Sequence, residues 1–169
     1  MGFKPMSVKS ISDRPAAIQH GMSFSEQALG SRWRTPRRTI TEYDFMTFVT
    51  TFGFNEDLFM DAAAAAEMGF KGRVIPGALT LSLAEGLVIG SGALTGTGMA
   101  FLGGEMSVKG PVFVGDTLEV WVEVIAARLT SSAERGIVTT RNEVRNQDGQ
   151  IVMTFTPSRM IKVNPSPRL

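Results

Sequence analysis

Helix and strand signals occupy separate halves of this chain, and this segregation limits the fold more than any other feature of the sequence. Between residues 41 and 90, apolar residues recur at helical spacing and are interrupted by typical helix caps. From Thr117 to Val124, apolar and polar residues alternate, and Asp148-Gly149 separates two further strand-like runs. Strands that follow helices, rather than alternating with them, predict an α+β fold. A curved antiparallel sheet of about four long strands, wrapped around one central helix, fits this order best.

The central helix is predicted to begin at Pro76 and Gly77, where proline suits a first turn. Two earlier helices are expected, one starting at the capping box of residues 41–44 and ending at Gly53, and one capped by Asp61. Leucines form one stripe of the central helix, and small residues form another, namely Ala78, Ser82, Gly86 and Gly90. These two stripes predict a helix that lies flat and close against a sheet.

Two features of the later strands predict local irregularity. Gly103-Gly104 interrupts a strand pattern and indicates a bulge or a close approach of two backbones. Pro157 places the last strand at a sheet edge or at a bulge, because proline cannot donate to the ladder.

Composition excludes several classes of function. The 169 residues carry a net charge of +1, which argues against nucleic acid or an anionic membrane as the main partner. The chain has no cysteine and one histidine, so we expect no thiolate site and no metal centre. Glu85 and several glycines interrupt the most apolar stretch, which therefore does not predict a membrane span.

One domain is the default at this length, and we assign it residues 31–169. Residues 1–30 are predicted to be a variable N-terminal leader. This leader lacks the apolar core of a secretory signal, but it is basic and poor in acidic residues, so a transit peptide stays open as an alternative to a loose extension. The expected location is cytoplasmic.

From Trp33 to Val163 the chain resembles the MaoC-like dehydratases, also called (R)-specific enoyl-CoA hydratases. The stretches that carry the resemblance occur in family order, at residues 38–44, 72–77, 79–82, 110–118 and 145–152. The resemblance implies the hot-dog fold and the reversible hydration of a 2-enoyl thioester. It implies no cofactor, with acyl-CoA as substrate or ligand.

The chain departs from the family where the chemistry occurs. Hydration needs a base to activate water and an acid to protonate the α-carbon. In the family, an aspartate and a histidine of a Gly-Asp-x-Asn-Pro-x-His-x-Asp motif supply them. Residues 53–61 match this motif without a gap, and they place Phe54 at the aspartate position and Phe59 at the histidine position. Phenylalanine cannot transfer a proton, and the single histidine, His20, lies in the leader.

The substrate cradle is retained in part. Gly77 matches the family glycine whose backbone N–H donates to the thioester oxygen, although it follows Pro76 where the family has a histidine. A free N–H at a helix N-terminus would favour developing negative charge there. Phe54 and Phe59 could line an apolar pocket for an acyl chain, or simply belong to the core. Lys71 and Arg73 could bind the phosphates of coenzyme A, or be ordinary solvated residues.

Three carboxylates are candidates for a relocated acid or base. Glu56 and Asp57 lie beside the lost dyad, where the simpler interpretation is that Asp57 starts a helix and Glu56 faces solvent. Glu85 lies midway along the central helix, as in some hot-dog thioesterases that use a helix carboxylate. If buried, its pKa would be raised toward neutrality, but a surface or subunit contact would explain it equally simply.

Three hypotheses follow. The chain is an acyl-CoA hydratase or dehydratase with displaced acid/base residues, a catalytically inactive acyl-thioester-binding subunit that pairs with a dyad-bearing homologue, or a hot-dog thioesterase that uses Glu85. All three predict an acyl thioester ligand. A homodimer, or a heterodimer with a related subunit, is the expected minimum assembly because small hot-dog subunits expose sheet edges.

Overall fold

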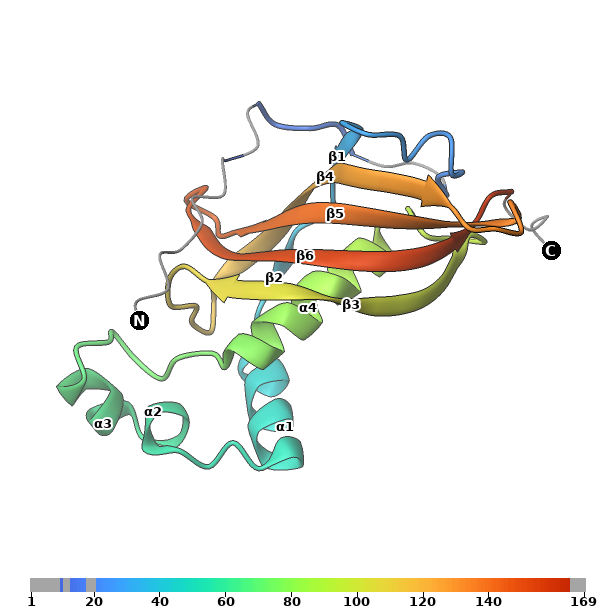
Figure 1. The fold of residues 1–169 in the computed structure, drawn as a ribbon. Helices are drawn as coiled ribbons and strands as arrows, with labels where there is room; N and C mark the ends of the chain where they lie inside the picture. Colours follow the sequence, from blue (N-terminus) through green and yellow to red (C-terminus); the bar gives the residue numbers. More distant parts are fainter. Residues whose placement is uncertain (1–9, 11–12, 18–20, 165–169) are drawn as a thin grey trace, which may run out of the picture.

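The computed structural model describes residue 10, residues 13–17 and residues 21–164. Its helices are α1 (Glu42–Phe52), α2 (Asp57–Met60), α3 (Ala62–Glu67) and α4 (Gly77–Gly90). Its strands are β1 (Arg32–Arg34), β2 (Arg38–Thr39), β3 (Gly98–Val108), β4 (Thr117–Leu129), β5 (Arg135–Arg145) and β6 (Ile151–Lys162). The main sheet is antiparallel with the order β1-β4-β5-β6-β3, and β2 also pairs with β4. Helix α4 lies against the curved sheet, and α1 to α3 extend from one end (Figure 1). The predicted α+β fold is confirmed.

Local capping fixes the helices that precede α4. Thr41 and Asp44 form the predicted capping box, in which each residue's side chain accepts a hydrogen bond from the other's backbone N–H. Gly53 ends α1 with a left-handed φ of 71°. Asp61 caps α3 by accepting from the backbone N–H of Ala63 at 2.7 Å. These caps determine where α1 begins and ends and where α3 begins. We call the segment between α1 and α4 (residues 53–76), which contains α2 and α3, the overhang.

Helix α4 contacts the sheet through large apolar residues rather than small ones. Leu79, Leu83 and Val88 are buried in the core with the inward-facing valines of β4. The stripe of small residues faces the other way, because Ala78, Ser82, Gly86 and Gly90 are all exposed. The helix thus lies against the sheet as predicted, but its small stripe is on the side away from the sheet. The free energy of burying leucine and valine exceeds that of burying glycine or serine, so the larger stripe takes the sheet side.

The predicted irregularity lies between β3 and β6. A Cβ on Gly104 would lie 2.6 Å from the carbonyl oxygen of Thr156, so only glycine permits this close approach of two backbones. The β3 register shifts between Phe101 and Gly103, which has a φ of 129°. Pro157 lies opposite this bulge, as one of its two interpretations predicted. The edge interpretation is wrong because β6 pairs with both β5 and β3.

Part of the segment assigned to the leader contacts the domain. The backbone N–H of Met22 donates to the carbonyl of Ala93 at 3.0 Å, and that of Gly30 donates to Val124 at 2.9 Å. The side chains of Met22 and Gln27 are buried. Residues 21–30 therefore cover the end of the sheet, whereas residues 1–9, 11–12 and 18–20, including His20, lie outside the described residues.

Glu119 ties the N-terminal segment to the outer face of the sheet. Its carboxylate accepts from Arg14 at 3.0 Å, from Arg34 at 3.1 Å and from the indole N–H of Trp121 at 2.8 Å. Burial alone would raise the pKa of the Glu119 carboxyl, but the hydrogen bond from Trp121 and the charges of Arg14 and Arg34 outweigh it. The pKa therefore lies below the ordinary value of 4.5.

We expect Glu119→Gln to reduce the free energy of unfolding by about 1–3 kcal/mol at pH 7. Because the pKa of Glu119 is lower in the folded chain, its carboxylate stabilises the fold above the unfolded-state pKa, and this stabilisation is lost as the pH falls through the folded value. Urea unfolding from pH 7 to pH 3 should show the two chains converging below pH 4.5. Glu123→Gln is the matched control, because the side chain of Glu123, which pairs with Arg141, is more exposed than that of Glu119. A difference that stays constant with pH would contradict the assignment.

Candidate functional site

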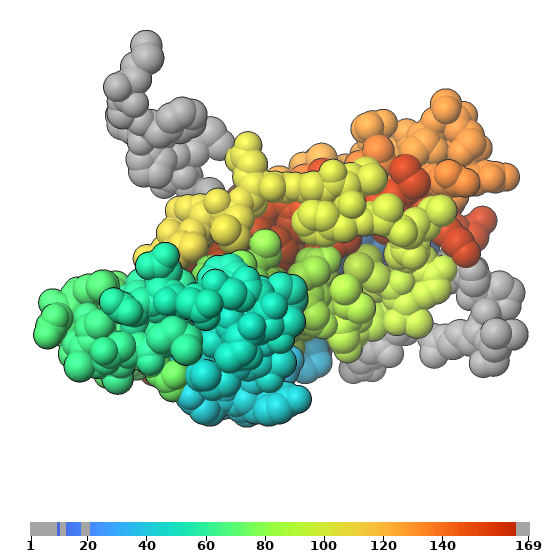
Figure 2. Space-filling view, turned by 90° about the horizontal axis from the view of Figure 1, so that it is seen from below, coloured from blue at the N-terminus to red at the C-terminus, as the bar shows by residue number. Residues whose placement is uncertain are grey.

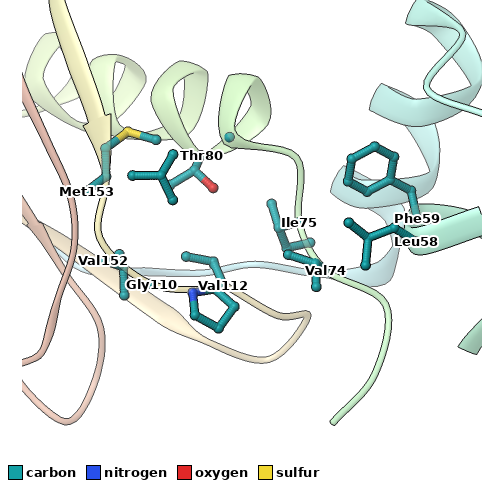
Figure 3. A pocket seen from close by; sticks show the side chains of 12 residues that line it. Leu58, Phe59, Val74, Ile75, Thr80, Gly110, Val112, Val152 and Met153 are labelled. Carbon is teal, nitrogen blue, oxygen red and sulfur yellow. The ribbon is translucent and has the colours of Figure 1, made fainter. Parts of the chain in front are cut away.

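A cavity of about 220 Å³ lies at the N-terminal end of α4, between the overhang and the ends of β3 and β6 (Figure 3). Twelve residues line it: Leu58, Phe59, Val74, Ile75, Gly77, Thr80, Val108, Gly110, Pro111, Val112, Val152 and Met153. None of these twelve carries a titratable side chain. The hydroxyl of Thr80 donates to the carbonyl of Pro76 at 3.3 Å. The cavity is therefore apolar apart from backbone groups and one hydroxyl.

Gly77 lines this cavity as the first residue of α4. A helix leaves its first four N–H groups without an intrahelical acceptor, and its dipole adds partial positive charge there. A Cβ on Gly77 would lie 3.3 Å from Cγ2 of Val108 on β3, so a side chain here would press on the cavity wall. A backbone donor, a positive helix end and an apolar surrounding together suit a carbonyl oxygen that acquires negative charge.

The two phenylalanines at the dyad positions lie together beside this helix end. Phe59 lines the cavity, and the ring centroid of Phe54 lies 6.0 Å from that of Phe59. Phe54 in turn contacts Phe48 of α1 at 5.1 Å, so Phe54 supports Phe59 from behind and is not itself a lining residue. Both residues are partly buried against the main core. The position at which the family places its acid and base is an aromatic wall in this chain.

Glu56 and Asp57 do not line the cavity. Both are exposed, Glu56 as the N-cap of α2 and Asp57 as its first residue. This placement matches the simpler interpretation of these two residues. A role for either residue as a relocated acid or base stays a prediction.

Glu85 lies eight residues after Gly77, roughly 12 Å along the helix axis at 1.5 Å per residue. Its carboxylate accepts two hydrogen bonds from the guanidinium of Arg159 on β6, one of them from Nε at 3.2 Å. Both carboxylate oxygens of Glu85 are therefore engaged in an ion pair with a buried guanidinium. Arg159 was not among the residues predicted from the sequence, although it is an arginine in the last strand-like run of the chain.

Lys71 and Arg73 differ in their availability to a ligand. Arg73 pairs with Glu42, donates to the sulfur of Met46 at 3.3 Å and stacks on Phe45 at 4.9 Å, so it fastens the overhang to α1. Lys71 is exposed, and its Nζ lies 4.4 Å from the ring centroid of Phe113. Lys71 also lines a polar depression of about 470 Å³ with Lys109, Asn146 and Gln147. This depression shares Gly110, Pro111 and Val152 with the apolar cavity.

The sequence and the fold have counterparts among known proteins. The model of the MaoC like domain matches residues 24–147. The chain belongs to the MaoC-like family.

This MaoC-like chain is 36% identical over 97 residues to the (R)-specific enoyl-CoA hydratase of Aeromonas caviae, covering 57% of this chain and 68% of the relative. A MaoC-like dehydratase from Rhodospirillum rubrum superposes with a TM-score of 0.78 at 26% identity, covering 86% of this chain and all of that one. A Mycobacterium tuberculosis protein with a double hot-dog fold gives a TM-score of 0.76 at 20% identity, covering 88% of this chain and 46% of that one. The hot-dog fold is thus confirmed.

None of the helices that the structure describes is long and apolar enough to cross a membrane. Within the described residues, no group of three or more histidine, aspartate or glutamate side chains could hold a metal ion.

Proposed function

We propose that this MaoC-like chain binds an acyl thioester at Gly77 and serves as the acyl-binding subunit of a hydratase or dehydratase whose acid and base lie on a dyad-bearing partner. The observation that carries the proposal is the cavity lining, which combines a helix N-terminus with eleven other residues that offer no proton donor or acceptor of suitable pKa. Such a site can bind and polarise a thioester. It cannot by itself activate water.

The binding mode follows from the residues around the cavity. The thioester oxygen accepts from the Gly77 N–H, and the acyl chain lies among Phe59, Ile75 and Val112. The adjoining polar depression leads from Gly110 to Lys71. We assign Lys71 to a phosphate of coenzyme A because its side chain is exposed and, unlike Arg73, pairs with no carboxylate among the described residues.

An exposed sheet edge offers the surface for a partner subunit. Strand β3 pairs only with β6 among the described strands. It exposes five large apolar residues, Met99, Phe101, Leu102, Met106 and Val108. Val108 is 56% exposed and also lines the cavity, so a subunit seated on β3 would adjoin the acyl site. The exposed small stripe of α4 continues the same face, where α4 and β3 both reach the surface (Figure 2).

In the absence of the dyad-bearing partner, we expect two copies of this chain to pair through β3. Phe101→Lys combined with Met106→Lys should convert this homodimer into a monomer, because two charges on the buried edge would lose their solvation. Size-exclusion chromatography with light scattering measures this change. Leu129→Lys, which places a charge at a comparably exposed apolar residue of β4, should leave the mass unchanged. A native chain that is monomeric at high concentration would contradict the assignment of β3.

The function itself is tested by titrating the purified chain with a panel of trans-2-enoyl-CoA thioesters. Loss of the conjugated thioester absorbance reports hydration, and release of free thiol reports hydrolysis. We expect binding with neither signal. Hydration by the chain alone would favour relocated acid/base residues, the second candidate that similarity to the Aeromonas caviae hydratase supports. Thiol release would favour the thioesterase that uses Glu85, and absence of binding would refute the proposal.

A further inference from the structure

An ion pair beneath the central helix joins α4 to the sheet. Arg159 of β6 is only 5% exposed, and its guanidinium bonds both carboxylate oxygens of Glu85. The remaining nitrogen of that guanidinium donates to the hydroxyl of Thr140 on β5 at 3.2 Å. The guanidinium also lies 5.9 Å from the ring of Phe101 on β3. One buried arginine thus connects the helix with three strands.

This pair is the one ionic link between α4 and the sheet among the described residues. Glu85 is the single charged residue of α4, whose other sheet-facing residues make apolar contacts through Leu79, Leu83 and Val88. Apolar burial is not directional, so it specifies the rotation of a helix less sharply than hydrogen bonds do. A bidentate guanidinium–carboxylate pair fixes both position and angle, because its two hydrogen bonds are parallel.

We propose that the Glu85–Arg159 pair is a positioning device that sets the axial position and rotation of α4, and thereby the placement of the Gly77 N–H in the acyl cavity. Gly77 is the first residue of the same helix, and it lines the cavity. A rotation or axial shift of α4 would therefore move the Gly77 N–H relative to the cavity. The inference rests on the proposed acyl-thioester function, but it concerns residues outside the cavity.

We expect the Glu85–Arg159 pair to determine the position of α4 rather than to stabilise the fold. Replacing a buried ion pair by apolar residues of similar volume is often neutral or stabilising, whereas removing one partner leaves a buried charge unpaired. The informative variant is therefore the double substitution Glu85→Leu, Arg159→Met. Its matched control is Glu123→Leu, Arg141→Met, which removes a pair of β4 and β5 on the sheet face away from α4.

The experiment combines three measurements on each variant: the unfolding temperature, the dissociation constant for butyryl-CoA, and the amide chemical shift and hydrogen exchange of Gly77 by NMR. We expect the Glu85→Leu, Arg159→Met chain to unfold no earlier than the native chain. Its affinity for butyryl-CoA should fall by up to about 10-fold, which is the whole contribution of the Gly77 hydrogen bond. The chemical shift of its Gly77 amide should change, while the control variant should keep both the native affinity and the native Gly77 chemical shift.

Native affinity together with an unchanged Gly77 amide in the Glu85→Leu, Arg159→Met chain would overturn the inference. If that chain does not fold, Glu85→Gln decides instead, because it retains the side-chain volume and one oxygen but loses the charge. Failure of the proposed function is distinguishable, because a native chain that binds no butyryl-CoA still reports the position of α4 through its Gly77 amide.

Discussion

The double substitution Phe54→Asp, Phe59→His is expected to give the chain hydration activity on trans-2-enoyl-CoA roughly 100-fold or more above that of the native chain. General acid–base catalysis contributes 10²- to 10⁴-fold when the groups are correctly placed. Phe59 lines the cavity that contains Gly77, and the ring of Phe54 lies 6.0 Å away. The cradle is therefore present, and the two proton-transferring groups are what is missing. The measurement is the initial rate of absorbance loss of the conjugated thioester.

Each single substitution serves as a control and should add little hydration activity, because one group cannot act as both acid and base in the required geometry. Equal initial hydration rates for the native chain and the double variant would contradict the prediction. If both rates are measurable, residues 54 and 59 do not take part and the acid and base lie elsewhere in the chain.

Phe54→Asp also removes the aromatic contact with Phe48. This loss should reduce the free energy of unfolding by about 0.5–1.5 kcal/mol per ring pair, which urea unfolding would report.

Gly77→Pro is expected to weaken acyl-CoA binding about 10-fold, the contribution of one lost hydrogen bond of roughly 1–1.5 kcal/mol. Proline is accommodated at the first position of a helix, so this substitution removes the N–H without breaking α4. In the chain that carries Phe54→Asp and Phe59→His, the same change should lower the hydration rate by roughly 10²- to 10³-fold, because the donor is worth most in the transition state.

Gly77→Ala separates this hydrogen bond from the added side chain. Alanine retains the N–H and adds the same Cβ, which meets Val108 at 3.3 Å. Val108 is largely exposed and can yield, so the affinity of Gly77→Ala should stay close to that of the native chain. Isothermal titration with butyryl-CoA distinguishes the two variants. A similar loss in both would show that the space at residue 77, and not its N–H, is what the ligand needs.

Features governed by neighbouring residues were predictable from the sequence. The capping box of Thr41 and Asp44, the Gly53 helix end and the Asp148-Gly149 hairpin all involve hydrogen bonds or turns within a few residues. The absence of the dyad was equally evident, because a motif of fixed spacing identifies Phe54 and Phe59 without a structure. The strand β1 was missed because three residues give too short a pattern to recognise.

The sequence by itself determined the fold class, the helix ends and the loss of the proton-transferring side chains, since each depends on residue type and short spacing. Only the tertiary structure decided which side of α4 meets the sheet, which of Lys71 and Arg73 can bind a phosphate, and what Glu85 contacts. In the sequence, Arg73 and Lys71 are equally plausible phosphate ligands. The fold places Glu42 of α1, which is 31 residues away in the sequence, in an ion pair with Arg73. Arg159 meets Glu85 across 74 residues. Such partners depend on the three-dimensional path of the chain, which carries no local pattern in the sequence.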